Sequence, residues 1–145
     1  MEIQRTDLFR QAETVRTLEE CNSRTAAFGL TLTEEEMAAL AEGRERALAD
    51  TGRVEFGNGI LPALIDTLCD SPYLQQSDWA ETLLAAQEIF YRWKGEAGDL
   101  VPDRALLAFL RRGFDGARGA MAYLEGFSLG ELRERMEDET WNPEK

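Results

Sequence analysis

One stretch of the chain would be apolar on nearly every side of a helix. The sequence SDWAETLLAAQEIFYRWK, residues 77–94, places the three charged side chains between its ends, Glu81, Glu88 and Arg92, on one narrow face at helical spacing. Tryptophan, leucine, alanine and phenylalanine side chains cover the other faces. A helix with so little polar surface is stable when other elements surround it. The stretch therefore predicts a central helix over about 78–94, packed on several sides.

Helical periodicity recurs along the rest of the chain. Apolar residues at helical spacing predict helices over 6–22, 34–50 and 59–69, and Pro102 suits the first turn of a further helix. The helix over 34–50 is expected to bury one set of side chains, namely Met37, Leu40, Ala41, Ala47 and Leu48.

Helix-start signals support this succession of helices. Thr33 and Glu36 have the spacing of a capping box, and so do Ser128 and Glu131. The single strand candidate, RVEF at 53–56, is too short to make a sheet. We therefore predict an all-α fold, a single compact bundle of six or seven short helices around the central one. Residues 1–136 would form one helical domain, and residues 137–145 an acidic, frayed tail.

Three glycines within eight residues mark the segment GRVEFGNGIL, residues 52–61. Gly52 is placed to end the preceding helix, and Gly57 and Gly59 permit backbone angles that other residues resist. If the chain crosses here in extended form, Val54 and Phe56 point the same way, into the core.

The same segment lacks the residues of a phosphate-binding loop. Such a loop needs a lysine and a serine or threonine after its last glycine, where this chain has Ile60, Leu61 and Pro62. Asn58 suits instead the cap of the following helix. The segment is predicted to be a structural crossing between two helices.

The net charge of −12 limits the classes of partner. Nucleic acids and acidic membrane surfaces are disfavoured, because binding to phosphates requires cations. The charge suits solubility or a basic protein partner. The N-terminus carries no signal-peptide pattern, and no apolar run approaches the ~20 residues of a membrane span. We therefore expect a cytoplasmic protein. In that compartment Cys21 and Cys69 would be reduced.

The chain contains no histidine, which excludes several chemistries. A Ser-His-Asp triad, a Cys–His dyad and a histidine-ligated zinc site cannot form. No cofactor is predicted. The remaining enzyme hypothesis is an all-carboxylate magnesium site like that of helical nucleotide pyrophosphohydrolases, which use two acidic pairs on facing helices. The candidate ligands are the pairs Glu42/Glu45 and Glu96/Asp99.

Two kinds of surface could bind a partner. The stretch with Arg104, Arg111, Arg112 and Arg118 is either a solvated helix face or a docking patch for an acidic partner. Aromatic and apolar side chains are the other candidates for an interface, and a patch of this kind predicts a two-fold homodimer. These candidates are Tyr73, Leu84, Tyr91 and, in the polar tail, Trp141. Tyr91 lies at helical spacing, so a core position is its alternative, and Trp141 either folds back onto the body or is an exposed anchor.

Four blocks of the chain resemble the signature of a known family. The segments FGLTLTEEEMAAL, GRVEFGNGI, CDSPY and EIFYRWKGE are similar to those of small, acidic bacterial proteins grouped as a domain of unknown function. The resemblance covers about Cys21 to Leu132. It implies a bacterial, intracellular origin, and it carries over no activity, cofactor, partner or site residue.

The sequence therefore favours an interaction module over an enzyme. The leading hypothesis is a non-catalytic helical module or subunit of a bacterial complex that acts through a protein partner. The alternative is the magnesium-dependent carboxylate enzyme.

Overall fold

The computed structural model describes residues 2–55, 59–97, 101–126, 128–131 and 134. These residues form six α-helices and two 3-10 turns, and no strand is found among them. The α-helices are α1 (Glu2–Thr25), α2 (Glu34–Asp50), α3 (Leu61–Leu68), α4 (Trp79–Ala97), α5 (Asp103–Gly116) and α6 (Met121–Glu125); the turns are η1 (Ala26–Phe28) and η2 (Gln76–Asp78). The predicted all-α bundle is confirmed.

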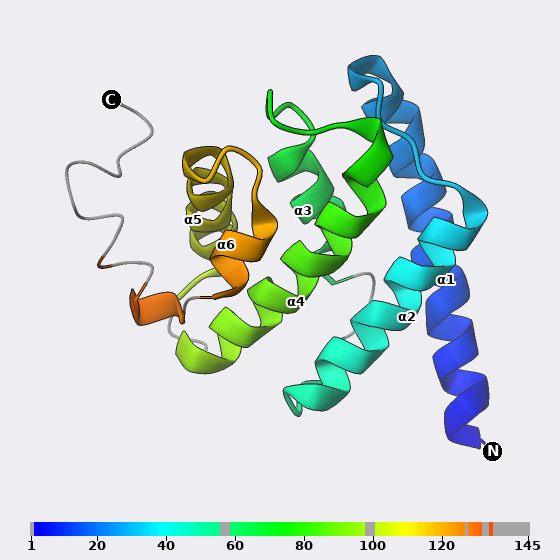
Figure 1. Cartoon of the computed structure of the whole chain (residues 1–145). Coiled ribbons are helices and arrows are strands. Elements are labelled where there is room, and N and C mark those ends of the chain that lie inside the picture. The colour runs from blue at the N-terminus through cyan, green and yellow to red at the C-terminus, as the bar shows by residue number, and fades with distance from the viewer. Residues whose placement is uncertain (1, 56–58, 98–100, 127, 132–133, 135–145) are drawn as a thin grey trace.

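Helix α4 is the centre of the bundle. In Figure 1 it runs between α2 on one side and α5 with α6 on the other, and α1 lies beyond α2. It contacts α2, α3, α5 and α6. Both of its tryptophans, Trp79 and Trp93, are fully buried. The helix is enclosed because its apolar residues leave only a narrow charged face for solvent, which confirms the predicted central helix.

The start of α2 is fixed by a capping box. The Thr33 hydroxyl accepts a hydrogen bond from the Glu36 backbone N–H at 3.1 Å, and the Glu36 carboxylate accepts one from the Thr33 N–H at 2.8 Å. Two N–H groups that lack a partner within the helix are thereby satisfied. The helix ends before Gly52, whose φ of +66° is the left-handed angle typical of a helix end. Both predicted boundaries are confirmed.

Replacing Thr33 with alanine is expected to lower the free energy of unfolding by about 1 kcal/mol, because one cap hydrogen bond is lost. Thr31→Ala is the matched control, since Thr31 is exposed two residues earlier and does not cap the helix. Thermal or urea unfolding measures both variants. Equal losses in the two variants would show that the cap contributes nothing.

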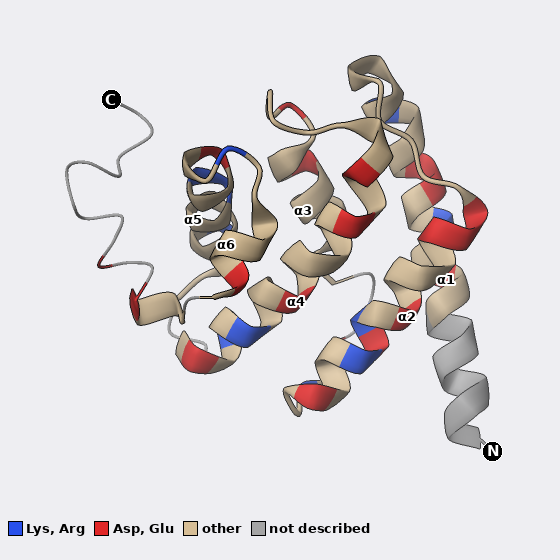
Figure 2. Cartoon of the chain, viewed as in Figure 1, with Lys and Arg blue, Asp and Glu red and all other residues tan. Residues whose placement is uncertain are grey.

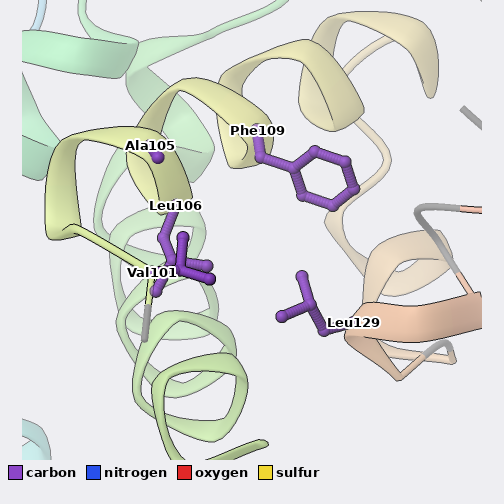
Figure 3. Close-up of a pocket in the computed structure, with 5 residues that line it drawn as sticks. All are labelled: Val101, Ala105, Leu106, Phe109 and Leu129. Carbon is purple, nitrogen blue, oxygen red and sulfur yellow. The ribbon is translucent and has the colours of Figure 1, made fainter. Parts of the chain in front are cut away.

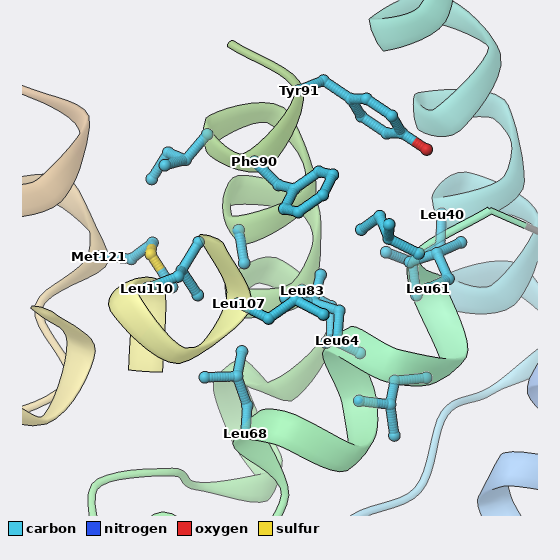
Figure 4. Close-up of a cluster of buried hydrophobic side chains, with 14 of the residues drawn as sticks. Leu40, Leu61, Leu64, Leu68, Leu83, Phe90, Tyr91, Leu107, Leu110 and Met121 are labelled. Atoms are coloured by element: carbon cyan, nitrogen blue, oxygen red, sulfur yellow. The ribbon is translucent and has the colours of Figure 1, made fainter. Parts of the chain in front are cut away.

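The core is built mainly from leucines contributed by all the longer helices (Figure 4). All five side chains predicted to face inward from α2 are buried. The core includes Leu40, Leu61, Leu64, Leu68, Leu83, Phe90, Leu107, Leu110 and Met121. None of the described helices combines the length and the hydropathy that crossing a membrane requires.

The crossing between α2 and α3 differs from the prediction in one respect. Val54 is 71% exposed, so the prediction that it enters the core is wrong. Glu55 is turned inward instead, and in an extended chain successive side chains point to opposite sides. Three further predictions lie outside the described residues. They are the core packing of Phe56, the left-handed angle of Gly57 and the helix cap at Asn58.

The end of this crossing agrees with the prediction for one glycine. Gly59 has a φ of +62°, in the left-handed region predicted for it. The residue that precedes α3 is Ile60, and it makes no side-chain cap hydrogen bond. Pro62 lies in the first turn of α3, where its missing N–H costs nothing.

Candidate functional site

A groove runs between α3 and α5. It has a volume of about 570 Å³, and helix α3 contributes one wall and helix α5 the other. The groove combines small or apolar residues with three arginines, and Figure 2 shows the positive charge on α5. Its lining consists of Ala63, Asp66, Thr67, Arg104, Leu107, Ala108, Arg111 and Arg112. We call this feature the α3–α5 groove.

Arg111 holds one end of the groove in place. Its Nη1 donates to the Thr67 carbonyl oxygen at 2.8 Å and to the Asp70 carboxylate, and its Nε donates to Asp115 Oδ2 at 2.7 Å. The Ser71 hydroxyl donates to the other Asp115 oxygen at 2.8 Å. The guanidinium fork therefore ties α5 to the end of α3, so the two walls are fixed relative to each other.

Arg104 and Arg112 differ from Arg111. Within the described part of the chain neither forms an ion pair or a hydrogen bond, and the Nε atom of Arg112 is buried without a partner. Arg104 is exposed and Arg112 is half-buried. A chain with 28 acidic and 16 basic residues has many carboxylates that could pair with them. Two cations without such a partner, beside an apolar floor, form a surface suited to an acidic ligand.

The fourth arginine of the basic stretch lies elsewhere. Arg118 follows α5 in a turn, with a φ of +55°, and lines a different hollow beside Ala120 and Tyr123. The sequence did not separate it from the other three, because charge patterning alone does not show where the helix ends.

A second group of polar residues is buried between α2, α4 and the α2–α3 crossing. Arg44 is fully buried, and its guanidinium lies 3.8 Å from Glu45 Oε2 and 3.9 Å from Glu55 Oε1. The Tyr91 hydroxyl donates to Glu55 Oε1 at 2.6 Å. Figure 4 shows the Tyr91 ring extending from α4 toward α2. Gly59 lies against the same groups. We call these five residues the Arg44 cluster.

The Arg44 cluster binds the crossing segment to the core. A buried guanidinium requires nearby carboxylates, and Glu45 and Glu55 are both mostly buried beside it. The cluster joins Glu55 and Gly59 of one signature block to Tyr91 of another, which gives those blocks a structural role. The sequence analysis did not single out Arg44. It lies one turn from both Leu40 and Leu48 on the apolar face of α2, and this spacing indicates a buried side chain.

The Tyr91 hydroxyl is expected to make stability depend on alkaline pH. Burial, and then the hydrogen bond to Glu55, raise the pKa of Tyr91 above its ordinary value. The unfolded chain loses this proton near pH 10 while the folded protein keeps it, so the free energy of unfolding falls as pH rises from about 10. Tyr91→Phe should flatten this slope in urea unfolding, whereas Tyr73→Phe, at an exposed tyrosine, should not. Equal slopes in both variants would contradict the assignment.

An apolar pocket of about 210 Å³ lies between α5 and the segment that follows α6 (Figure 3). Phe109 packs edge-to-face against Trp93, with ring centroids 5.5 Å apart, and Leu129 lines the pocket from the segment after α6. Leu129 is held by its N–H, which donates to Glu96 Oε1 at 2.7 Å. The lining residues are all apolar, namely Val101, Ala105, Leu106, Phe109 and Leu129. The pocket can hold an apolar side chain, and none of its described lining residues carries a group for acid–base chemistry.

The predicted magnesium ligands are not brought together in the described structure. Glu42 is exposed and pairs with Arg46 at 3.6 Å, whereas Glu45 turns toward Arg44. Glu96 supports Leu129, and Asp99 lies outside the described residues. Among the residues that are described, no group of three or more His, Cys, Asp and Glu side chains is placed to hold a metal ion.

The predicted apolar patch is not one surface. Tyr91 is fully buried, which confirms its alternative as a core residue and contradicts its place in a surface patch: its ring packs in the core and its hydroxyl bonds to Glu55. Leu84 is half-buried and faces Gly43 of α2, and Tyr73 is 41% exposed in a loop beside Gly119. The homodimer prediction was argued from such a patch, and these three residues do not form one. Trp141 lies outside the described residues.

The two cysteines carry free thiols. Cys21 is buried, and burial raises the pKa of its thiol despite the neighbouring Arg24. Burial also raises the pKa of the Cys69 thiol. A raised pKa keeps both thiols mainly protonated at neutral pH, and a protonated thiol is a weaker nucleophile than a thiolate.

Comparison with known proteins adds the family. No curated protein matches the chain, and no solved structure matches it. One family model does match, over residues 17–141, which include the Arg44 cluster and both walls of the α3–α5 groove. The chain belongs to the family described as "Family of unknown function (DUF6323)".

Proposed function

We propose that the chain is a helical protein-interaction module, a subunit or adaptor, whose α3–α5 groove binds an acidic segment of a protein partner. The observation that carries this proposal is the pair of groove arginines, Arg104 and Arg112, which have no partner within the described part of the chain.

The groove has the two components of a protein-binding surface. Leu107 and Ala108 supply an apolar floor, and burial of such surface drives association. The arginines at its edge can form paired hydrogen bonds with carboxylates, which fix the position of a ligand. The net charge of −12 repels a nucleic acid along its whole length, whereas a short acidic segment interacts mainly with the groove arginines, because salt screens charges that lie more than about 10 Å away.

Site-specific photocrosslinking in the cells that make the protein tests the proposal. A benzophenone amino acid at Ala108, which is exposed in the groove, is expected to crosslink one partner protein that mass spectrometry identifies. The same amino acid at Ala39, exposed on α2, is the control position.

Arg112→Glu is expected to remove the crosslink at Ala108, because the charge reversal repels the acidic segment. Arg46→Glu makes the same charge change on α2 and should leave the crosslink unchanged. Crosslinks that occur only at Ala39, or that persist in Arg112→Glu, would contradict the proposal.

A further inference from the structure

We infer that the ligand of the α3–α5 groove is an acidic α-helix that carries two carboxylates two turns apart. This inference rests on the proposed function and specifies the kind of partner. It follows from the groove floor, the spacing of the arginines and the position of Asp66.

The groove floor favours a helix over an extended peptide. An extended segment would lay its backbone N–H and C=O groups against Ala63, Leu107 and Ala108, which cannot satisfy them. Recognition of an extended segment by strand addition needs a sheet edge, and the described residues contain no strand. A helix satisfies its own backbone and presents side chains alone. The two alanines in the lining let it approach closely.

The arginines set the spacing of the carboxylates. Arg104 and Arg112 are eight residues apart on α5, a rise of about 12 Å at 1.5 Å per residue. On a partner helix lying along α5, residues seven apart share one face and span about 10.5 Å. Long arginine side chains cover the small difference. Each arginine then faces one carboxylate.

The opposite wall determines which edge of the partner is acidic. Asp66 of α3 lines the groove, and it already pairs with Arg24 at 2.9 Å. A carboxylate that faced α3 would meet Asp66, which offers it no hydrogen-bond donor and whose charge Arg24 already balances, whereas one that faces α5 meets Arg104 or Arg112. The carboxylates are therefore expected along one edge of the partner helix, with small apolar residues beside them.

Selection from a displayed library of single helices tests the inference. The probe is an alanine-rich helical peptide with randomised positions along one face, selected against the full-length protein. Pairs of Asp or Glu seven or eight residues apart should be enriched about tenfold or more over other spacings. Selection against the Arg104→Glu, Arg112→Glu double variant should instead enrich Lys or Arg at the same spacing. Arg46→Glu, the matched control, should give the wild-type pattern.

Calorimetry on one selected peptide completes the test. Moving one carboxylate from position i+7 to i+5 places it on another face and should weaken binding about tenfold, which corresponds to the loss of one charged contact. Three selection results would overturn the inference: no enrichment of acidic residues, acidic enrichment without a preferred spacing, and the same pattern in the double variant. In calorimetry, tighter binding of a short single-stranded DNA than of the peptide would also overturn it. A partner crosslinked at Ala108 through a segment without such a helix would overturn this inference and leave the proposed function standing.

Discussion

Replacing Gly59 with alanine is expected to lower the free energy of unfolding by about 3 kcal/mol. Part of this loss is backbone strain, because Gly59 has a φ of +62° and an alanine at such an angle costs about 1–2 kcal/mol. The remainder comes from overpacking, which typically costs about 1–3 kcal/mol. A methyl group at this position would lie 2.7 Å from Arg44 Nε, 2.9 Å from Glu55 Oε1 and 3.0 Å from the Tyr91 hydroxyl oxygen. These groups cannot all retreat without disturbing the Arg44 cluster.

Gly52→Ala separates the two contributions. Gly52 has nearly the same angle, a φ of +66°, but nothing lies within 4 Å of a methyl group built on it. Its replacement should therefore show the strain alone, about 1–2 kcal/mol. Urea unfolding of both variants gives the difference directly. If the two substitutions cost the same, the Arg44 cluster does not pack against Gly59 as described.

Features that depend on nearby residues could be predicted from the sequence. The capping boxes at Thr33/Glu36 and Ser128/Glu131 are both formed, because each needs two residues three positions apart. The buried face of α2 followed from helical periodicity, and the central place of α4 from its lack of polar surface.

Features that depend on distant residues could not be predicted in the same way. Val54 was expected inside, and the alternation of an extended chain would then turn Glu55 outside. Hydropathy alone favours the same order. The order is reversed because Arg44, eleven residues earlier, is buried and requires a carboxylate. The sequence left Tyr91 open between the core and a surface patch, because its partner Glu55 lies 36 residues away.

The α3–α5 groove combines features of both kinds. The arginines of α5 were recognised as a candidate docking patch, since they lie close in sequence. Their neighbours Ala63 and Thr67 belong to α3, and only the packing of α3 against α5 makes a groove of them. The different role of Arg111 also depends on distant residues. Asp70 and the Thr67 carbonyl accept hydrogen bonds from Arg111 and not from Arg104 or Arg112.

Glu55→Ala is expected to lower the free energy of unfolding by about 2–3 kcal/mol. The change leaves the buried guanidinium of Arg44 with Glu45 as its remaining carboxylate, and it leaves the Tyr91 hydroxyl without its acceptor. The estimate lies below the usual cost of breaking a buried pair, because the Glu55 side chain is 20% exposed. Glu42→Ala, at an exposed ion pair with Arg46, is the control and should cost about 0.5 kcal/mol or less.

A double-mutant cycle with Arg44→Met shows which of the two losses dominates. Methionine fills much of the same space without a charge, and replacing a buried ion by an apolar residue is often close to neutral. In the Arg44→Met background, Glu55→Ala should cost about 1 kcal/mol, since only the Tyr91 hydroxyl then loses its partner. The coupling of about 1–2 kcal/mol measures the charge interaction. An equal cost of Glu55→Ala in both backgrounds would mean that Glu55 acts through Tyr91 alone, and that the 3.9 Å approach to Arg44 contributes nothing to holding the crossing against the core.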